Sequence, residues 1–171
     1  MDFLLKSGWR RDEVLKLRWS DCNVELKHAT TRIKGGDVVT RPLSKALLAI
    51  IERQTKAGPY VFTYECQQSR AKRRKGERYP LTATSLRKPF AQALIDAKIS
   101  AFRLHDLRHT RGTRIVRSTG SLAAAKEALK HRSIATTLRY AHVMDEDVRR
   151  ALEASDHRNN TEEQPDQQLK A

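Results

Sequence analysis

The spacing of apolar positions along the chain predicts several helices and one small β-ribbon. Two strand-like stretches, "NVELKHATTRI" (23–33) and "VVTRPLS" (38–44), flank "KGGD", whose adjacent glycines supply the positive φ of a tight hairpin turn. "KALLAIIERQTKA" (45–57) then has helical periodicity. The order of a helix, a β-ribbon and then mostly helices indicates an α+β fold, with a small antiparallel β-sheet near the N-terminus.

The second half of the chain has mostly helical periodicity. In "TATSLRKPFAQALIDAKI" (82–99), one helical face carries Leu86, Phe90, Ala93, Leu94 and Ala97. Pro89 fits only if it falls in the first turn. Further helices are expected in "HDLRHTRGTRIVRS", "SLAAAKEALK", "IATTLRYAH" and "DEDVRRALEA". Residues 155–171 lack apolar periodicity, so we expect one domain over 1–154 and a disordered tail over 155–171.

The charge of the chain indicates a polyanionic partner. Its 171 residues carry a formal net charge of +14. The expected tail contributes −2, so the remaining 154 residues carry +16. Such an excess of positive charge raises self-repulsion in the compact state and normally reflects a polyanionic partner. Arg73, Arg74 and Lys75 in the basic stretch "SRAKRRKGERYP" (69–80) are candidate contacts to a DNA backbone, although a solvated loop explains them almost as well.

The cysteines and the apolar runs bear on the cellular location of the chain. Cys22 and Cys66 stand apart, without a CxxC pair, and match neither a disulfide framework nor a zinc site. No apolar run approaches membrane-spanning length. A reducing cytoplasm is the simplest location for such a chain.

The densest group of chemically useful residues is "HDLRHT" (105–110). His105 and Arg108 lie three positions apart, so they share a helical face. A planar guanidinium suits phosphate oxygens, and an imidazole nearby can donate a hydrogen bond or carry a proton. Taken alone, such a pair is more often part of a solvated basic helix that contacts a DNA backbone.

A second group lies in "LKHRSIATTLRYAH" (129–142). A phenol with a pKa of about 10 is a poor nucleophile unless cations or a base surround it, so Tyr140 alone is best explained as an aromatic at the edge of the core. His131 alone is a cation at a helix C-terminus, and Lys34 a solvated turn residue.

Taken in chain order, these stretches resemble the motifs of the tyrosine recombinase (phage integrase) family. The resemblance begins with "SGWRRDEVLKLRWSD" (7–21), continues through the hairpin lysine, "HDLRHT" and "LKHRSIATTLRYAH", and covers residues 4–152. The catalytic residues that it implies are Arg10, Lys34, His105, Arg108, His131 and the nucleophile Tyr140. Arg11 replaces Arg10 if the register slips, and Glu13 falls at an acidic position that supports the arginine.

The resemblance also implies a reaction: cleavage and rejoining of double-stranded DNA through a 3′-phosphotyrosyl intermediate. Arg10 and Arg108 would hold the phosphate, and Lys34 would protonate the leaving 5′-oxygen, so neither a metal nor another cofactor is expected. Self-association on DNA is also expected. A non-catalytic DNA-binding remnant and a type IB topoisomerase-like enzyme remain alternatives.

The chain departs from the family pattern in three respects. Trp9 stands where the family usually has a small or aliphatic residue before Arg10. Lys130 stands where the family usually has glycine before the histidine, and it would cost roughly 1 kcal/mol if the backbone there has positive φ. Family members also carry an upstream helical DNA-clamping domain, which this chain would lack. The chain is therefore expected to be an excised fragment or a truncated gene product.

Overall fold

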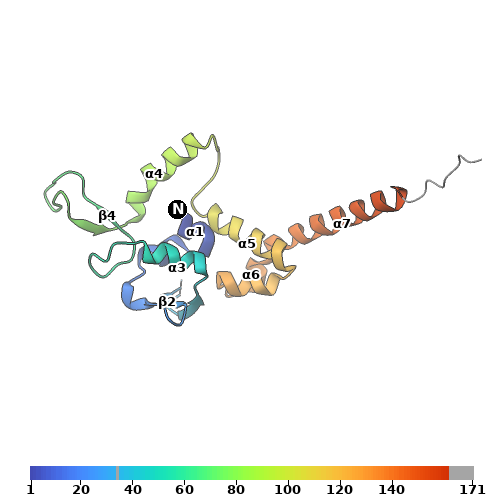
Figure 1. Ribbon diagram of the computed structural model, residues 1–171, viewed down its shortest axis with the longest axis horizontal. Helices are drawn as coiled ribbons and strands as arrows, with labels where there is room; N and C mark the ends of the chain where they lie inside the picture. Colours follow the sequence, from blue (N-terminus) through green and yellow to red (C-terminus); the bar gives the residue numbers. More distant parts are fainter. Residues whose placement is uncertain (34, 162–171) are drawn as a thin grey trace, which may run out of the picture. The chain divides into compact units, whose positions relative to one another are not determined.

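The computed structural model describes the backbone of residues 1–33 and 35–161 (Figure 1). Lys34 and residues 162–171 lie outside this range. The chain divides into two compact units, Met1–Arg111 and the part from Gly112 onward. None of the helices in the described residues combines the length and apolar character needed to cross a membrane.

The first unit combines short helices with two small antiparallel sheets, which confirms the predicted α+β fold. Its helices are α1 (Asp2–Ser7), α2 (Arg11–Leu15), the 3-10 turn η1 (Trp19–Asp21), α3 (Lys45–Glu52) and α4 (Ala83–Asp96). One sheet has the order β1 (Cys22–Asn23), β2 (His28–Arg32) and β3 (Val38–Pro42). The other pairs β4 (Thr63–Glu65) with β5 (Arg78–Pro80).

The core of the first unit forms around α1 and α3. Phe3 packs edge-on against Trp9, with ring centroids 5.4 Å apart, and lies 5.0 Å from Phe62. The hydroxyl of Ser44 accepts a hydrogen bond from the Leu47 N–H and so caps α3. This core anchors the segment around Trp9 that leads into the predicted arginine motif.

The predicted hairpin is formed by β2 and β3. Thr31 pairs with Val39, and Ala29 pairs with Arg41. Because side chains alternate along a strand, Ala29, Thr31 and Arg41 all face inward and are buried. An arginine thus lies in the buried face of the hairpin.

The prediction for Pro89 is wrong. Thr82 and Ser85 form a reciprocal capping box, so α4 begins at Ala83 and Pro89 falls in its second turn. Proline there removes one hydrogen bond to the carbonyl four residues earlier. Leu86, Phe90 and Leu94 are half-buried, as expected, whereas Ala93 and Ala97 of the predicted face are exposed. No α4 residue is fully buried.

The second unit is helical where it is described. It contains the end of α5 (Asp106–Thr119), which begins in the first unit, and then α6 (Leu122–Leu129) and α7 (Ala141–Thr161). The helix expected over 134–142 is instead two 3-10 turns, η2 (Ile134–Thr136) and η3 (Leu138–Tyr140), followed by the start of α7. The buried core residues are Ile115, Val116, Ala125, Leu129, Tyr140 and Val143.

The boundary expected between residues 154 and 155 does not coincide with the end of a helix. α7 continues through residues 155–161, so that part of the predicted tail is helical. The remainder of the predicted tail lies outside the described residues.

Candidate active site

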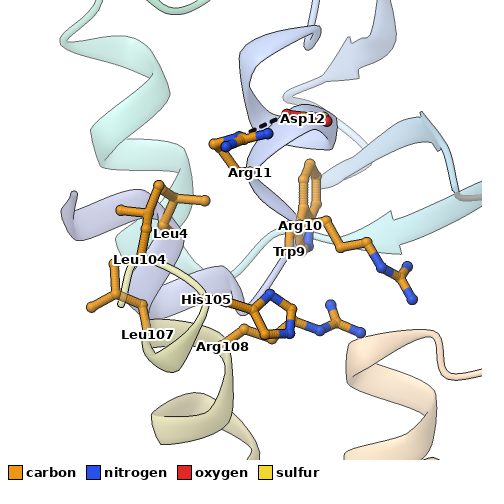
Figure 2. A pocket seen from close by; sticks show the side chains of 9 residues that line it. All are labelled: Leu4, Trp9, Arg10, Arg11, Asp12, Leu104, His105, Leu107 and Arg108. Carbon is orange, nitrogen blue, oxygen red and sulfur yellow. Dashed lines mark hydrogen bonds and ion pairs between the residues drawn. The ribbon is translucent and has the colours of Figure 1, made fainter. Parts of the chain in front are cut away.

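Three of the predicted catalytic residues line one pocket of the first unit. Arg10, His105 and Arg108 lie around a pocket of about 280 Å³. Figure 2 shows the guanidinium groups of Arg10 and Arg108 extending in the same direction, with the imidazole of His105 beside Arg108. The other lining residues are Leu4, Trp9, Arg11, Asp12, Leu104 and Leu107. Two fixed cations and an imidazole therefore meet in a space large enough for a phosphate group.

Arg10 is fixed by Glu13, three residues further along. Arg10 is the N-cap residue of α2, and its backbone N–H donates to Glu13 Oε2 at 3.0 Å. Its side-chain Nη1 donates to Glu13 Oε1 at 3.1 Å. Because Glu13 is buried, this carboxylate holds both the backbone and the guanidinium of Arg10.

Both Arg10 and Arg11 line the pocket, but the geometry favours Arg10 as the arginine that groups with His105 and Arg108. Arg11 Nε pairs with Asp12 Oδ1 at 2.8 Å, and both side chains are largely exposed. In Figure 2 the Arg11 side chain turns toward Asp12 and away from His105 and Arg108. The register in which Arg10 carries the motif is thus the one that brings the arginines together.

Arg108 is almost completely buried, with 3% of its surface exposed. Its Nη1 donates to the carbonyl of Gly8 at 2.6 Å. Gly8 ends α1 with a φ of 67°, a conformation that glycine adopts at little cost, and its N–H bonds to the Leu4 carbonyl at 2.9 Å. Gly8, two residues before Arg10, therefore lets the chain turn and presents a carbonyl to Arg108.

His105 lies in surroundings that favour its neutral form. Burial lowers the pKa of the imidazole, and the positive charge of Arg108 lowers it further, although Asp106 acts in the opposite direction. The His109 ring packs edge-on against it, with centroids 4.8 Å apart. A neutral imidazole can accept a hydrogen bond or a proton at neutral pH.

His131 and Tyr140 belong to the second unit. His131 is buried, and its Nδ1 shares a hydrogen bond of 2.9 Å with Oγ1 of Thr137, which is fully buried. This bond fixes the orientation of the ring. It also gives a reason for the 3-10 turns, because Thr137 points at His131 from the junction between η2 and η3.

Tyr140 is also buried, with 2% of its surface exposed. Its ring packs against Gly112 in α5. A Cβ atom added at Gly112 would lie 2.4 Å from Cζ and 2.7 Å from Oη of the phenol. Only glycine leaves room for the ring in this position.

Lys130 has the positive φ anticipated in the sequence analysis. It ends α6 at φ 52° and ψ 52°, in the left-handed region. Lys130→Gly should therefore raise the free energy of unfolding by about 1 kcal/mol, because glycine removes the steric cost of this conformation. Chemical denaturation measures the change, and Arg132→Gly serves as a control with the same residue introduced nearby. An unchanged or lowered stability in Lys130→Gly would contradict the assignment of strain.

The basic stretch 69–80 is an ordered extension of the β4–β5 hairpin. The guanidinium of Arg73 lies 5.6 Å from the ring centroid of Tyr64 and 5.7 Å from that of Tyr79. The backbone N–H of Arg74 donates to Tyr79 Oη, and that of Lys75 to Ser69 Oγ, each at 3.0 Å. All three predicted DNA contacts are exposed, and none of them lines the pocket around Arg10.

The structure thus brings Arg10, His105 and Arg108 together and places His131 and Tyr140 in the second unit. Lys34 lies outside the described residues. Within the residues that the structure covers, no group of three histidine, cysteine or acidic side chains could hold a metal ion.

The sequence analysis missed two residues that contact predicted site residues or their partners. Arg41 is buried and bonds to Glu13, and the alternation of the β3 strand, which makes position 41 face inward, could have indicated it. Gly112 accommodates the phenol of Tyr140, and a glycine inside a predicted helix was its only signal.

Comparison with known proteins shows which family the chain belongs to. The model of the Phage integrase family matches residues 1–147, so the chain is a member of that family. Among curated relatives, tyrosine recombinase XerA of Pyrococcus furiosus is 30% identical over 155 residues, covering 88% of this chain and 51% of the relative. Tyrosine recombinase XerC of Alcanivorax borkumensis is 26% identical over 84% of this chain and 46% of the relative. The integrase of Salmonella phage P22 is 24% identical over 84% of this chain and 38% of the relative.

Solved structures show the same fold. The crystal structure of XerA recombinase matches 89% of this chain and 54% of its own, with a TM-score of 0.65 and 21% identity. The catalytic domain of bacteriophage HP1 integrase matches 89% of this chain and 77% of its own, with a TM-score of 0.58 and 22% identity. The chain spans about half the length of the curated relatives that it matches.

Proposed function

We propose that this chain is the catalytic part of a tyrosine recombinase, which cleaves and rejoins double-stranded DNA through a 3′-phosphotyrosyl intermediate. The observation that carries the proposal is the pocket in which Arg10, Arg108 and His105 meet. Family membership and the net charge of +14 support DNA as the substrate.

The two arginines supply the charge that a phosphodiester needs when it is attacked. The negative charge on the two non-bridging oxygens grows toward the transition state, and fixed guanidinium donors stabilise it without having to reorganise. Arg108 is held by the Gly8 carbonyl and Arg10 by Glu13, so both are positioned before DNA arrives. Preorganised donors of this kind are worth about 10²–10³ in rate each.

In the proposed reaction, Tyr140 Oη forms a bond to phosphorus while the bond from phosphorus to the 5′-oxygen breaks. The phenolic proton passes to a base, for which the neutral His105 is the proposed acceptor, and the leaving 5′-oxygen takes a proton from Lys34. His131 donates a further hydrogen bond to the phosphate. The reverse attack by a 5′-hydroxyl reseals the strand, so no external energy source is required. Exchange between two DNA sites would bring several copies of the chain together.

The direct test is covalent trapping on a nicked suicide DNA substrate, from which the short 5′-hydroxyl fragment diffuses away after cleavage. We expect a protein–DNA adduct that survives denaturation. Salt-dependent binding without an adduct would instead support a non-catalytic DNA-binding protein. The burial of Tyr140 is the observation that favours this second candidate, because a buried phenol cannot reach a phosphate unless it moves.

The pKa of His105 leads to a prediction about pH. Because burial and Arg108 lower this pKa below the usual 6.5, the imidazole stays neutral at neutral pH and becomes protonated only in more acidic solution. The single-turnover cleavage rate should therefore be level around neutral pH and fall as the solution becomes more acidic than pH 6.5. His105→Gln should lower the rate and remove this acidic decline. A decline that persists unchanged in His105→Gln would assign the titration to another group.

The β4–β5 extension is proposed to follow the DNA backbone. Arg74→Gln with Lys75→Gln should reduce the slope of log affinity against log salt by about 0.9 for each phosphate that the variant no longer neutralises. Arg73 is retained, because it stacks on Tyr64 and Tyr79. Lys45→Gln with Arg53→Gln removes the same charge from the first residue and the C-cap of α3 and serves as the control. Equal slopes in the two double variants would exclude the extension from the interface.

We also propose a cytoplasmic location, where DNA is accessible and thiols stay reduced. Cys22 and Cys66 are both free, and burial, together with the nearby charge of Asp21, raises the pKa of the Cys22 thiol to about 11.

A further inference from the structure

Arg41 is a buried cation close to the candidate active site. It lies on β3 with only 1% of its surface exposed. Its Nε donates to Thr31 Oγ1 at 3.1 Å, its Nη2 donates to Glu13 Oε2 at 2.9 Å, and its guanidinium lies 5.1 Å from the ring centroid of Trp9. A charge buried this deeply is tolerated only when it is paired and hydrogen-bonded, and Glu13 supplies the pairing.

Glu13 is shared between two arginines. Its Oε2 accepts from Arg41 Nη2 and from the backbone N–H of Arg10, and its Oε1 accepts from Arg10 Nη1. The carboxylate is almost inaccessible, whereas the Arg10 side chain is 32% exposed and lines the pocket. Nε and Nη2 of Arg10 make no hydrogen bond within the described residues, so they can face a ligand.

We propose that Arg41 is a positioning residue, which keeps Arg10 directed into the pocket by occupying the buried side of Glu13. Without Arg41, Arg10 would be the remaining cation paired with the buried carboxylate among the residues that the structure describes. A guanidinium pairs best with a carboxylate through two parallel hydrogen bonds. Arg10 would turn toward Glu13 to form that pair, and its donors would leave the pocket. Arg41 therefore links the β2–β3 hairpin, through Glu13, to the residue that binds phosphate. This inference rests on the proposed function for its catalytic consequence, but not for its geometry.

Arg41→Met tests the proposal, because methionine keeps an unbranched apolar side chain against Trp9 and removes the charge. At saturating DNA, the rate of adduct formation should fall about tenfold to a hundredfold, while the dissociation constant for DNA stays nearly unchanged. Arg53→Met, an exposed arginine on the C-terminal side of α3, is the matched control and should leave both values unchanged.

A double-mutant cycle separates positioning from a merely structural role. If Arg41 acts through Glu13, Arg41→Met should cause little further loss of rate in a Glu13→Gln background. Thr31→Val, which removes the hydroxyl that accepts from Arg41 Nε, should leave the rate within about threefold of the unmodified chain. Additive losses in the cycle, or a Thr31→Val rate as low as that of Arg41→Met, would overturn the proposal.

A spectroscopic readout keeps this test independent of DNA cleavage. The ¹H–¹⁵N resonance of Arg10 Nε, assigned by its loss in Arg10→Lys, should shift in Arg41→Met and stay in place in Arg53→Met. If the unmodified chain forms no adduct but this shift occurs, the proposed function fails and the positioning role stands. An unmoved resonance in folded Arg41→Met would refute the positioning role. Should Arg41→Met not fold, Arg41→Gln, which also removes the charge but keeps a polar side chain for the buried site, provides the same comparison.

Discussion

Tyr140→Phe should abolish covalent trapping on suicide DNA while leaving the fold intact. The phenylalanine ring fills the same space against Gly112, so the packing of the second unit is kept. Loss of the hydroxyl should lower the free energy of unfolding by about 0.5–1.5 kcal/mol, the usual net contribution of one hydrogen bond. Because no oxygen remains to attack phosphorus, the adduct should fall below detection rather than decrease in part. Denaturing electrophoresis of a labelled DNA strand measures it.

Two comparisons make this result specific. Tyr60→Phe removes a hydroxyl from a half-buried ring that stacks under Arg18, and it should form the adduct normally. Tyr140→Phe should also bind DNA with the same salt dependence as the unmodified chain, since the affinity comes mainly from the basic surface. An adduct that persists in Tyr140→Phe would mean that another side chain is the nucleophile.

The parts of the molecule that could be predicted from sequence depend on local rules. Adjacent glycines at 35 and 36 both have positive φ, at 106° and 94°, and the two strands pair across them as the hairpin pattern requires. Lys130 replaces a family glycine, which predicts backbone strain there, and its φ is positive. Motif spacing favours Arg10 over Arg11, and the pocket geometry favours the same residue.

The parts that escaped prediction depend on contacts between distant residues. Arg41 and Glu13 are 28 positions apart, and the sequence around neither residue indicates that they form a buried ion pair. The helix expected over 134–142 breaks into 3-10 turns, where the Thr137 hydroxyl bonds to His131 instead of solvent. α4 begins at Ala83, too early for Pro89 to fall in its first turn, since the capping box formed by Thr82 sets its start.

The candidate site depends on contacts between residues that are distant in sequence. It was therefore found from the family motifs and not from the spacing of apolar positions. Periodicity identified the helix that carries His105 and Arg108, but a basic helix of this kind is commonly just solvated. What separates the two interpretations is the environment of Arg108, which is buried and bonded to the Gly8 carbonyl one hundred positions earlier in the chain. A buried guanidinium has to be hydrogen-bonded, and the Gly8 carbonyl is one of the acceptors that Arg108 uses.

Gly112→Ala should destabilise the second unit by about 1–3 kcal/mol, although alanine is the better helix former by about 1 kcal/mol. The added Cβ would lie 2.4 Å from Tyr140 Cζ, well inside contact distance, so either the helix or the ring must move. Because Tyr140 is buried in the core of this unit, we expect the ring to be displaced and the phenol to become accessible. Chemical denaturation measures the loss of stability, and nitration of Tyr140 by tetranitromethane, located by peptide mass, measures the exposure.

In a double-mutant cycle with Tyr140, the effect of Gly112→Ala on the free energy of unfolding should change sign. In a Tyr140→Phe background, Gly112→Ala should still destabilise, because the ring remains. In a Tyr140→Ala background, the space beside Gly112 is empty, and the same substitution should instead stabilise by up to about 1 kcal/mol through helix propensity alone. If Gly112→Ala has the same effect in all three backgrounds, the glycine does not accommodate the phenol, and the buried position of Tyr140 has to be explained by its other neighbours.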